Sequence, residues 1–169
     1  MLDNDLVSIL PRIGEIVVVS CSNSDNWSFL HTICDNYEST DQHAILGQIT
    51  INDQLFLFLY GINSSKNLEE FAWDLIVNKM LGYIILYEWT DSSTFTSTLE
   101  TIDFLTERID APLIVAADIG KEDFPVDISF FNDGITISSH TKFTFCRSDD
   151  SNSVKGVIRM LIDMLIEKM

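Results

Sequence analysis

Two strand-like runs, residues 46–51 and 54–60, are separated only by Asn52 and Asp53. Both runs are rich in leucine, isoleucine and aromatic residues, which is typical of strands. Two residues suffice for a hairpin turn, whereas a crossover to a parallel strand needs about ten residues or more. The two strands are therefore expected to pair antiparallel, and this short gap constrains the fold more than any other feature of the chain.

The rest of the chain alternates strand-like and helical patterns. The runs 14–19, 83–87 and 112–117 are nearly continuous in apolar residues, which indicates strands buried on both faces, as in a parallel sheet. A shorter run ending at Cys146 predicts a sixth strand. Apolar residues at helical spacing predict four helices, the first of about three turns, with these inward positions: Trp27, Leu30, Ile33 and Cys34; Leu68, Phe71, Ala72, Leu75 and Ile76; Phe95, Leu99, Ile102, Leu105 and Ile109; Val154, Val157, Ile158, Leu161 and Leu165.

This order of elements predicts an α/β fold with three layers. Its sheet is expected to have six strands, mostly parallel, with one antiparallel edge strand from the hairpin at 46–60. Helices should cover both faces of the sheet. The 169 residues suit one domain, 1–169, of which residues 1–13 form an N-terminal extension.

Composition limits the classes of partner and compartment. The net charge of −16 repels nucleic acid and anionic lipid and favours a basic protein partner, unless acidity serves only solubility. No apolar run reaches the roughly 18 residues of a membrane span, and the acidic start of the chain is unlike a signal peptide. The three cysteines, Cys21, Cys34 and Cys146, lack metal-type spacing and are expected to be free thiols. A cytoplasmic protein is expected.

Four segments carry a family resemblance. They are Gly47-Gln48-Ile49-Thr50 with the rest of the hairpin to Gly61, Leu81-Gly82-Tyr83-Ile84-Ile85-Leu86, Ala111-Pro112-Leu113-Ile114-Val115, and the stretch from Cys146 to Ser153-Val154-Lys155. In this order and spacing they resemble Ras-like small GTPases, which have a P-loop NTPase-like fold. The match is closer to the bacterial and archaeal branch of the gliding protein MglA and the ATP/GTP-binding proteins of conservon-type operons.

In that family the loop after the first strand binds phosphates with glycines, a lysine and a hydroxyl. Ser20 and Asp25 stand at the glycine positions here, Asn26 at the lysine position and Trp27 at the first hydroxyl position. An aspartate facing a triphosphate is repulsive, and no lysine compensates it. The degenerate phosphate-loop positions are Ser20, Ser22, Asn23, Ser24, Asp25, Asn26, Trp27 and Ser28.

Two further family sites are altered. Ser64 and Ser65 stand where the family has the glycine and glutamine that contact the γ-phosphate and orient water. The base-reading motif Asn-Lys-x-Asp aligns with a stretch from Asp118 to Lys121, in which Asp118 retains an acceptor but the lysine and final aspartate are absent. The resemblance therefore implies no catalytic residues, no cofactor, no metal and no enzyme activity.

A pseudo-GTPase that acts as a protein-interaction or regulatory module in signalling is the function that the resemblance implies. A Roadblock/LC7-type dimer is the partner class it suggests, and self-association stays open. Two alternatives also stay open: residual GTP or GDP binding without efficient hydrolysis, and a flavodoxin-like site for FMN or another phosphate ligand. The partner surface implied by the family comprises Tyr37, His43, Ser64, Ser65, Leu68 and Phe71.

Overall fold

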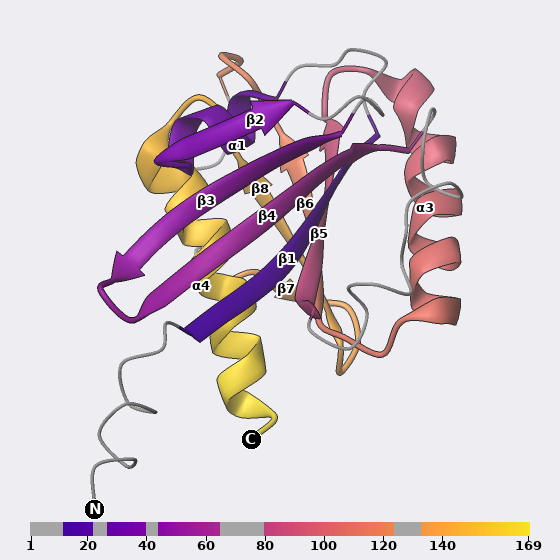
Figure 1. Ribbon diagram of the computed structural model, residues 1–169. Helices are drawn as coiled ribbons and strands as arrows, with labels where there is room; N and C mark the ends of the chain where they lie inside the picture. The colour runs from indigo at the N-terminus through magenta and orange to yellow at the C-terminus, as the bar shows by residue number, and fades with distance from the viewer. Residues whose placement is uncertain (1–11, 22–26, 40–43, 65–79, 124–132) are drawn as a thin grey trace, which may run out of the picture.

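The computed structural model describes residues 12–21, 27–39, 44–64, 80–123 and 133–169. These residues form one sheet of eight strands with helices on both of its faces (Figure 1). The strands are β1 (Arg12–Ser20), β2 (Asn36–Ser39), β3 (Ile45–Asn52), β4 (Leu55–Asn63), β5 (Met80–Glu88), β6 (Leu113–Asp118), β7 (Ile135–Thr136) and β8 (Thr141–Cys146).

The strands lie in the order β2-β3-β4-β1-β5-β6-β8-β7. The five strands from β4 to β8 through β1 run parallel, while β2, β3 and β7 pair antiparallel with their neighbours. The predicted α/β class and mostly parallel sheet are confirmed. The predicted hairpin is confirmed as well, because β3 pairs with β4 across the turn with Gln48 opposite Phe58.

The predicted count of six strands is wrong, because β2 and β7 bring the described sheet to eight. β2 lies in the polar stretch between the first predicted helix and the hairpin, and it, not β3, ends the sheet on that side. All four of its residues are exposed. An exposed edge strand needs no apolar face, so the polar sequence around Asn36 carries no strand signal.

The helical elements are α1 (Ser28–Ile33), η2 (Ser92–Thr94), α3 (Phe95–Arg108) and α4 (Ser151–Glu167). α1 and α4 cover one face of the sheet and α3 stands on the other (Figure 1). α1 is shorter than predicted, because Cys34 is already extended and Asp35 N–H donates to Gln48 O of β3. The helix predicted around 68–76 lies outside the described residues. No helix in the described ranges is long and apolar enough to span a membrane.

Alternation along β1 supplies a core to each face. Ile16 and Val18 are fully buried against α1 and α4, whereas Val17 and Val19 are fully buried on the α3 side. Each such side chain contributes about 1.5–3 kcal/mol of burial free energy. The unbroken apolar run of β1 is thus explained by burial on both faces.

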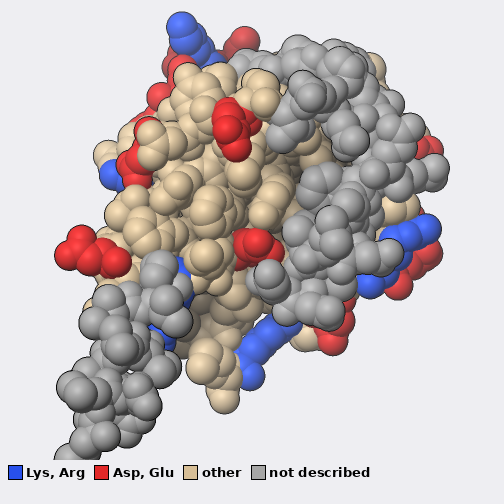
Figure 2. Space-filling model, in the orientation of Figure 1, with Lys and Arg blue, Asp and Glu red and all other residues tan. Residues whose placement is uncertain are grey.

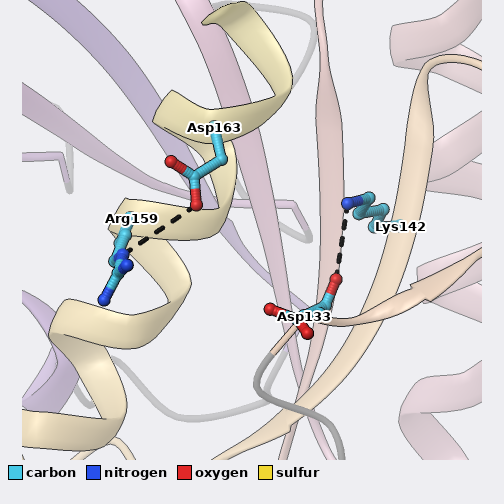
Figure 3. Close-up of polar contacts among 4 residues, drawn as sticks. All are labelled: Asp133, Lys142, Arg159 and Asp163. Carbon is cyan, nitrogen blue, oxygen red and sulfur yellow. Dashed lines mark hydrogen bonds and ion pairs between the residues drawn. The ribbon is translucent and has the colours of Figure 1, made fainter. Parts of the chain in front are cut away.

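The helix α4 confirms four of its five predicted inward positions, since Leu165 is only partly buried and Met160 and Met164 are buried in addition. It begins at Ser151, and Asp150 caps it by accepting a hydrogen bond from Asn152 N at 3.0 Å. Close approach to the sheet depends on Gly82, where an added Cβ would lie 2.8 Å from Leu161 Cδ1. The outer side carries an exposed ion pair between Arg159 and Asp163 at 3.9 Å (Figure 3), which contributes little to stability.

The predicted stripe of α3 is partly wrong. Leu105 and Ile109 are buried, but Phe95 and Leu99 are 54% and 47% exposed. The helix turns a different side to the sheet, with Thr94, Thr98 and Thr101 buried in addition to Leu105. Threonine is tolerated there because its hydroxyl bonds a carbonyl of its own helix, as Thr98 Oγ1 does with Thr94 O at 2.8 Å.

Candidate functional site

A small pocket lies at the carboxyl ends of the parallel strands. It forms where the chain leaves β1 and later crosses to β5, which is where ligands bind in open α/β sheets. Its volume is about 30 Å³, enough for about one water molecule. Three of the predicted site residues, Ser20, Ser28 and Asp118, are brought together in its wall. The lining residues are Ser20, Ser28, Phe29, Leu86, Tyr87, Glu88, Asp118 and Ser148.

Trp27, which directly precedes Ser28 of this pocket, is a core residue. It is 8% exposed and packs with α1 and α4 against the sheet. Its ring lies over Gly61, where an added Cβ would be 3.0 Å from Trp27 Cζ3 and 2.5 Å from Ile45 Cγ2. The end of the segment predicted as a degenerate phosphate loop is therefore held by apolar packing.

Asp118 connects two loops through one carboxylate oxygen. Its Oδ1 accepts hydrogen bonds from Gly120 N at 3.0 Å and Ser148 N at 3.3 Å. Gly120 has φ = 58°, a conformation that glycine adopts without strain. The acceptor that the sequence offered for reading a base is thus engaged by the protein's own backbone.

Arg147 braces the same two loops. Its guanidinium donates from Nη1 to Gly120 O at 2.5 Å and from Nη2 to Glu122 O at 3.0 Å. Its own N–H donates to Ser153 Oγ in the first turn of α4 at 2.8 Å. Lys121, aligned within the base-reading motif, is exposed.

Ser148 completes the network. Its carbonyl accepts from Thr32 Oγ1 of α1 at 2.7 Å, and its side chain is 6% exposed. Sequence reasoning missed Arg147 and Ser148 because their partners are backbone atoms of loops that are distant in sequence. The one sequence signal that could have pointed to them was the position of Arg147 directly after Cys146, which is buried.

Ser64 joins the end of β1 to α3. Its N–H donates to Ser20 O at 3.0 Å, and its hydroxyl lies 3.3 Å from Ser97 Oγ. Of the remaining partner-surface residues, Tyr37 is 54% exposed and stacks on His31 with ring centroids 4.2 Å apart. The predicted residues outside the described ranges are Ser22, Asn23, Ser24, Asp25, Asn26, His43, Ser65, Leu68 and Phe71.

The three cysteines are free, as predicted, and they are poor nucleophiles. Burial raises the pKa of Cys21, and burial together with the Asp118 carboxylate raises the pKa of Cys146. Burial, with a smaller contribution from Asp35, raises the pKa of Cys34 to about 12. Within the described ranges, no three His, Cys, Asp or Glu side chains gather as a metal site would require.

Comparison of the chain with protein-family models and with curated proteins found no match. Assignment of a function therefore depends on the residues of the chain and on the geometry above. That geometry offers a small pocket whose described lining contains no buried side-chain oxygen or nitrogen lacking a hydrogen bond. The loops at this pocket are held together by hydrogen bonds to backbone atoms, whereas a nucleotide site would need loops that are open to the ligand.

Proposed function

We propose that the protein is a Ras-like pseudo-GTPase, a catalytically inactive domain that acts as a protein-interaction or regulatory module and does not bind GTP. The sheet supports this proposal in its coarse features. Its mostly parallel strands, with β1 between β4 and β5, are compatible with a P-loop-like fold. The antiparallel pairing of β3 with β4 disfavours the flavodoxin-like alternative, which requires a crossover helix at that place.

The observation that carries the proposal is the engagement of Asp118. Reading a base at this edge would require its carboxylate to face a ligand, and here Gly120 and Ser148 amides hold the oxygen. Drug-sized ligands occupy pockets of about 300 Å³ or more, whereas this pocket is about 30 Å³. Opening it between these loops would also break the two bonds from the Arg147 guanidinium to the loop after β6.

A cytoplasmic location is part of the proposal. Three free thiols in one chain fit a reducing compartment. A Roadblock-type partner that contacts Tyr37 and Ser64 remains a prediction of the resemblance.

Thermal unfolding with nucleotide tests the proposal. At 1 mM GTP, GDP or FMN with magnesium, we expect the Tm to change by less than about 1 °C. A ligand present at 100 times its Kd would stabilise the native state by about 2.7 kcal/mol, or several degrees. A rise of several degrees with GTP or GDP would establish residual nucleotide binding, and a rise with FMN would favour the flavodoxin-like site.

A further inference from the structure

The α3 side of the sheet carries a row of aromatic residues on β4. Leu57 and Leu59 are buried on the α1 and α4 side, so Phe56, Phe58 and Tyr60 project to the opposite face. All three are half-buried. In Figure 1, β3 and β4 lie in front of α1 and α4, while α3 stands beside β5. No described helix packs over this aromatic row.

A groove of about 270 Å³ lies beside Phe58. Its floor is a row of paired residues across the strands, since Asn36 lies opposite Gln48 and Gln48 lies opposite Phe58. Neighbouring strands are about 4.8 Å apart, so the row crosses the outer part of the sheet in about 10 Å. The lining residues are Asn36, Tyr37, Glu38, Leu46, Gly47, Gln48 and Phe58.

Glu15 of β1 ends this row at the centre of the sheet. It pairs in register with Phe58 and is 9% exposed. Its Oε1 accepts a hydrogen bond from Tyr60 Oη at 3.0 Å, whereas its Oε2 is buried and has no partner. An unpartnered buried carboxylate oxygen is costly, and few occur in native proteins. A ligand that donates to Oε2 would remove this cost.

The charged residue in the lining of the groove, Glu38, is acidic. Residues 13–65, which include β2, β3, β4 and all of β1 except its first residue, Arg12, contain no lysine or arginine. Figure 2, viewed onto this face, shows a mostly uncharged surface with single acidic side chains set in it and basic side chains toward its lower edge. A cationic side chain would be complementary to the carboxylates and to the faces of the aromatic rings. The acidic residues of this stretch are Glu15, Asp25, Asp35, Glu38, Asp41 and Asp53.

We propose that this face docks a basic segment of a protein partner, with an arginine or lysine side chain that donates to Glu15 Oε2 beside Phe58 and Tyr60. The proposal rests on the proposed role as an interaction module, but not on the loss of nucleotide binding. Because Oε2 is buried, access to it requires a side-chain rearrangement on this face. Rotamer changes of this kind are common when interfaces form.

A peptide of alternating arginine and leucine residues is a suitable probe, with citrulline in place of arginine as its uncharged match. Fluorescence anisotropy with the full chain at 150 mM salt should show at least about tenfold weaker binding of the citrulline peptide, the scale of one charge-assisted hydrogen bond. Glu15→Gln should weaken binding of the arginine peptide by at least about tenfold. Glu107→Gln, an exposed site on α3, removes the same charge and should change binding less than about twofold.

Stability separates recognition from a structural role of Glu15. Glu15→Gln should keep or raise the Tm, because it removes a buried charge with an unpaired oxygen. Should that variant fail to fold, Phe58→Ala provides the test. The half-buried ring of Phe58 lines the groove, and its loss should weaken peptide binding at least about fivefold. Unchanged binding in the folded variants, or equal loss with Glu107→Gln, overturns the proposal.

Gel filtration of the protein alone tests whether a second copy of this chain, in place of a basic partner, fills the groove. A dimer that Glu15→Gln and Phe58→Ala both dissolve would show that a second copy of this chain fills the groove, and would overturn a basic partner. The change in Tm that added nucleotide causes is measured on the same variants. A nucleotide effect that Glu15→Gln leaves intact would overturn the pseudo-GTPase proposal without affecting the docking site.

Discussion

The helices α3 and α4 cover opposite faces of one sheet, yet they pack by different chemistry. α3 buries Thr98, Thr101 and Leu105. α4 buries only apolar side chains, namely Val154, Val157, Ile158, Met160, Leu161 and Met164. Because apolar burial is the main favourable term in folding, the α4 face is expected to hold most of the stability. The α3 face is left with polar groups that can serve recognition.

Polar contacts at the α3 face are satisfied locally. Thr101 Oγ1 donates to Ser97 O at 2.7 Å and accepts from the Cys21 thiol at 3.6 Å. Tyrosines are buried on this face too, since Tyr83 is 1% exposed beside Leu105 and Ile109. The helix α3 therefore buries hydroxyl groups against the sheet, whereas α4 buries only apolar side chains.

Truncating one leucine on each helix gives the largest expected contrast. Leu161→Ala on α4 removes a fully buried side chain and should lower the free energy of unfolding by about 2–5 kcal/mol. Leu99→Ala on α3 removes a side chain that is 47% exposed and should cost less than about 1 kcal/mol. Urea unfolding followed by circular dichroism measures both. Equal losses would mean that the two faces contribute alike.

The next largest effect is expected from alkaline pH, which should lower the stability that the α3 face contributes. Burial, with the nearby Asp110 carboxylate, raises the pKa of Tyr83 to about 12, and burial with the hydrogen bond to Glu15 raises that of Tyr60 to about 12. Since unfolded tyrosine titrates near 10, the folded state holds its proton more tightly. The resulting stability is complete below pH 10 and is lost as the pH rises to about 12.

Tyr83→Phe isolates this effect. Between pH 9 and 12 the wild-type protein should lose about 2 kcal/mol through Tyr83, and the variant should lose correspondingly less over the same range. Urea unfolding at each pH provides the measurement. A variant whose stability falls as steeply as that of the wild type would assign the alkaline loss to other groups.

Removing a buried hydroxyl from α3 has the smallest expected effect. Thr98→Val keeps the shape of a side chain that is 2% exposed and should raise stability by about 0.5 kcal/mol, because the hydroxyl bond to Thr94 O contributes little net. Thr106→Val, whose hydroxyl bonds Ile102 O on the exposed side, is the matched control and should change little. Thermal unfolding compares the pair. A loss above about 1 kcal/mol for Thr98→Val alone would mean that the polar packing is itself stabilising.

The elements that the sequence predicted correctly are those that depend on residues close together in the chain. The hairpin followed from the length of the gap at Asn52, and α4 followed from an apolar period that coincides with a cap at Asp150. The inner side of α3 was missed because Phe95 and Leu99 make the apolar stripe, whereas threonines with satisfied hydroxyls make the contact. Hydrophobic spacing does not register such threonines.

The candidate site was predicted in part. Ser20, Ser28 and Asp118 meet at the pocket because each ends a parallel strand or begins the following helix. The bonds of Arg147 to two carbonyls depend on how loops from distant parts of the chain come together, which no local pattern encodes. The unpaired oxygen of Glu15 is likewise a property of packing.

The central position of β1 has a consequence for how the chain folds. Arg12 pairs with Leu55 and Ser20 pairs with Leu86, so the first strand gains both neighbours only after about half of the chain is available. The β3–β4 hairpin, in contrast, closes over a two-residue turn. Non-local pairings slow folding, and local ones form within microseconds. We therefore expect the hairpin to form early and to serve as the template onto which β1 is laid.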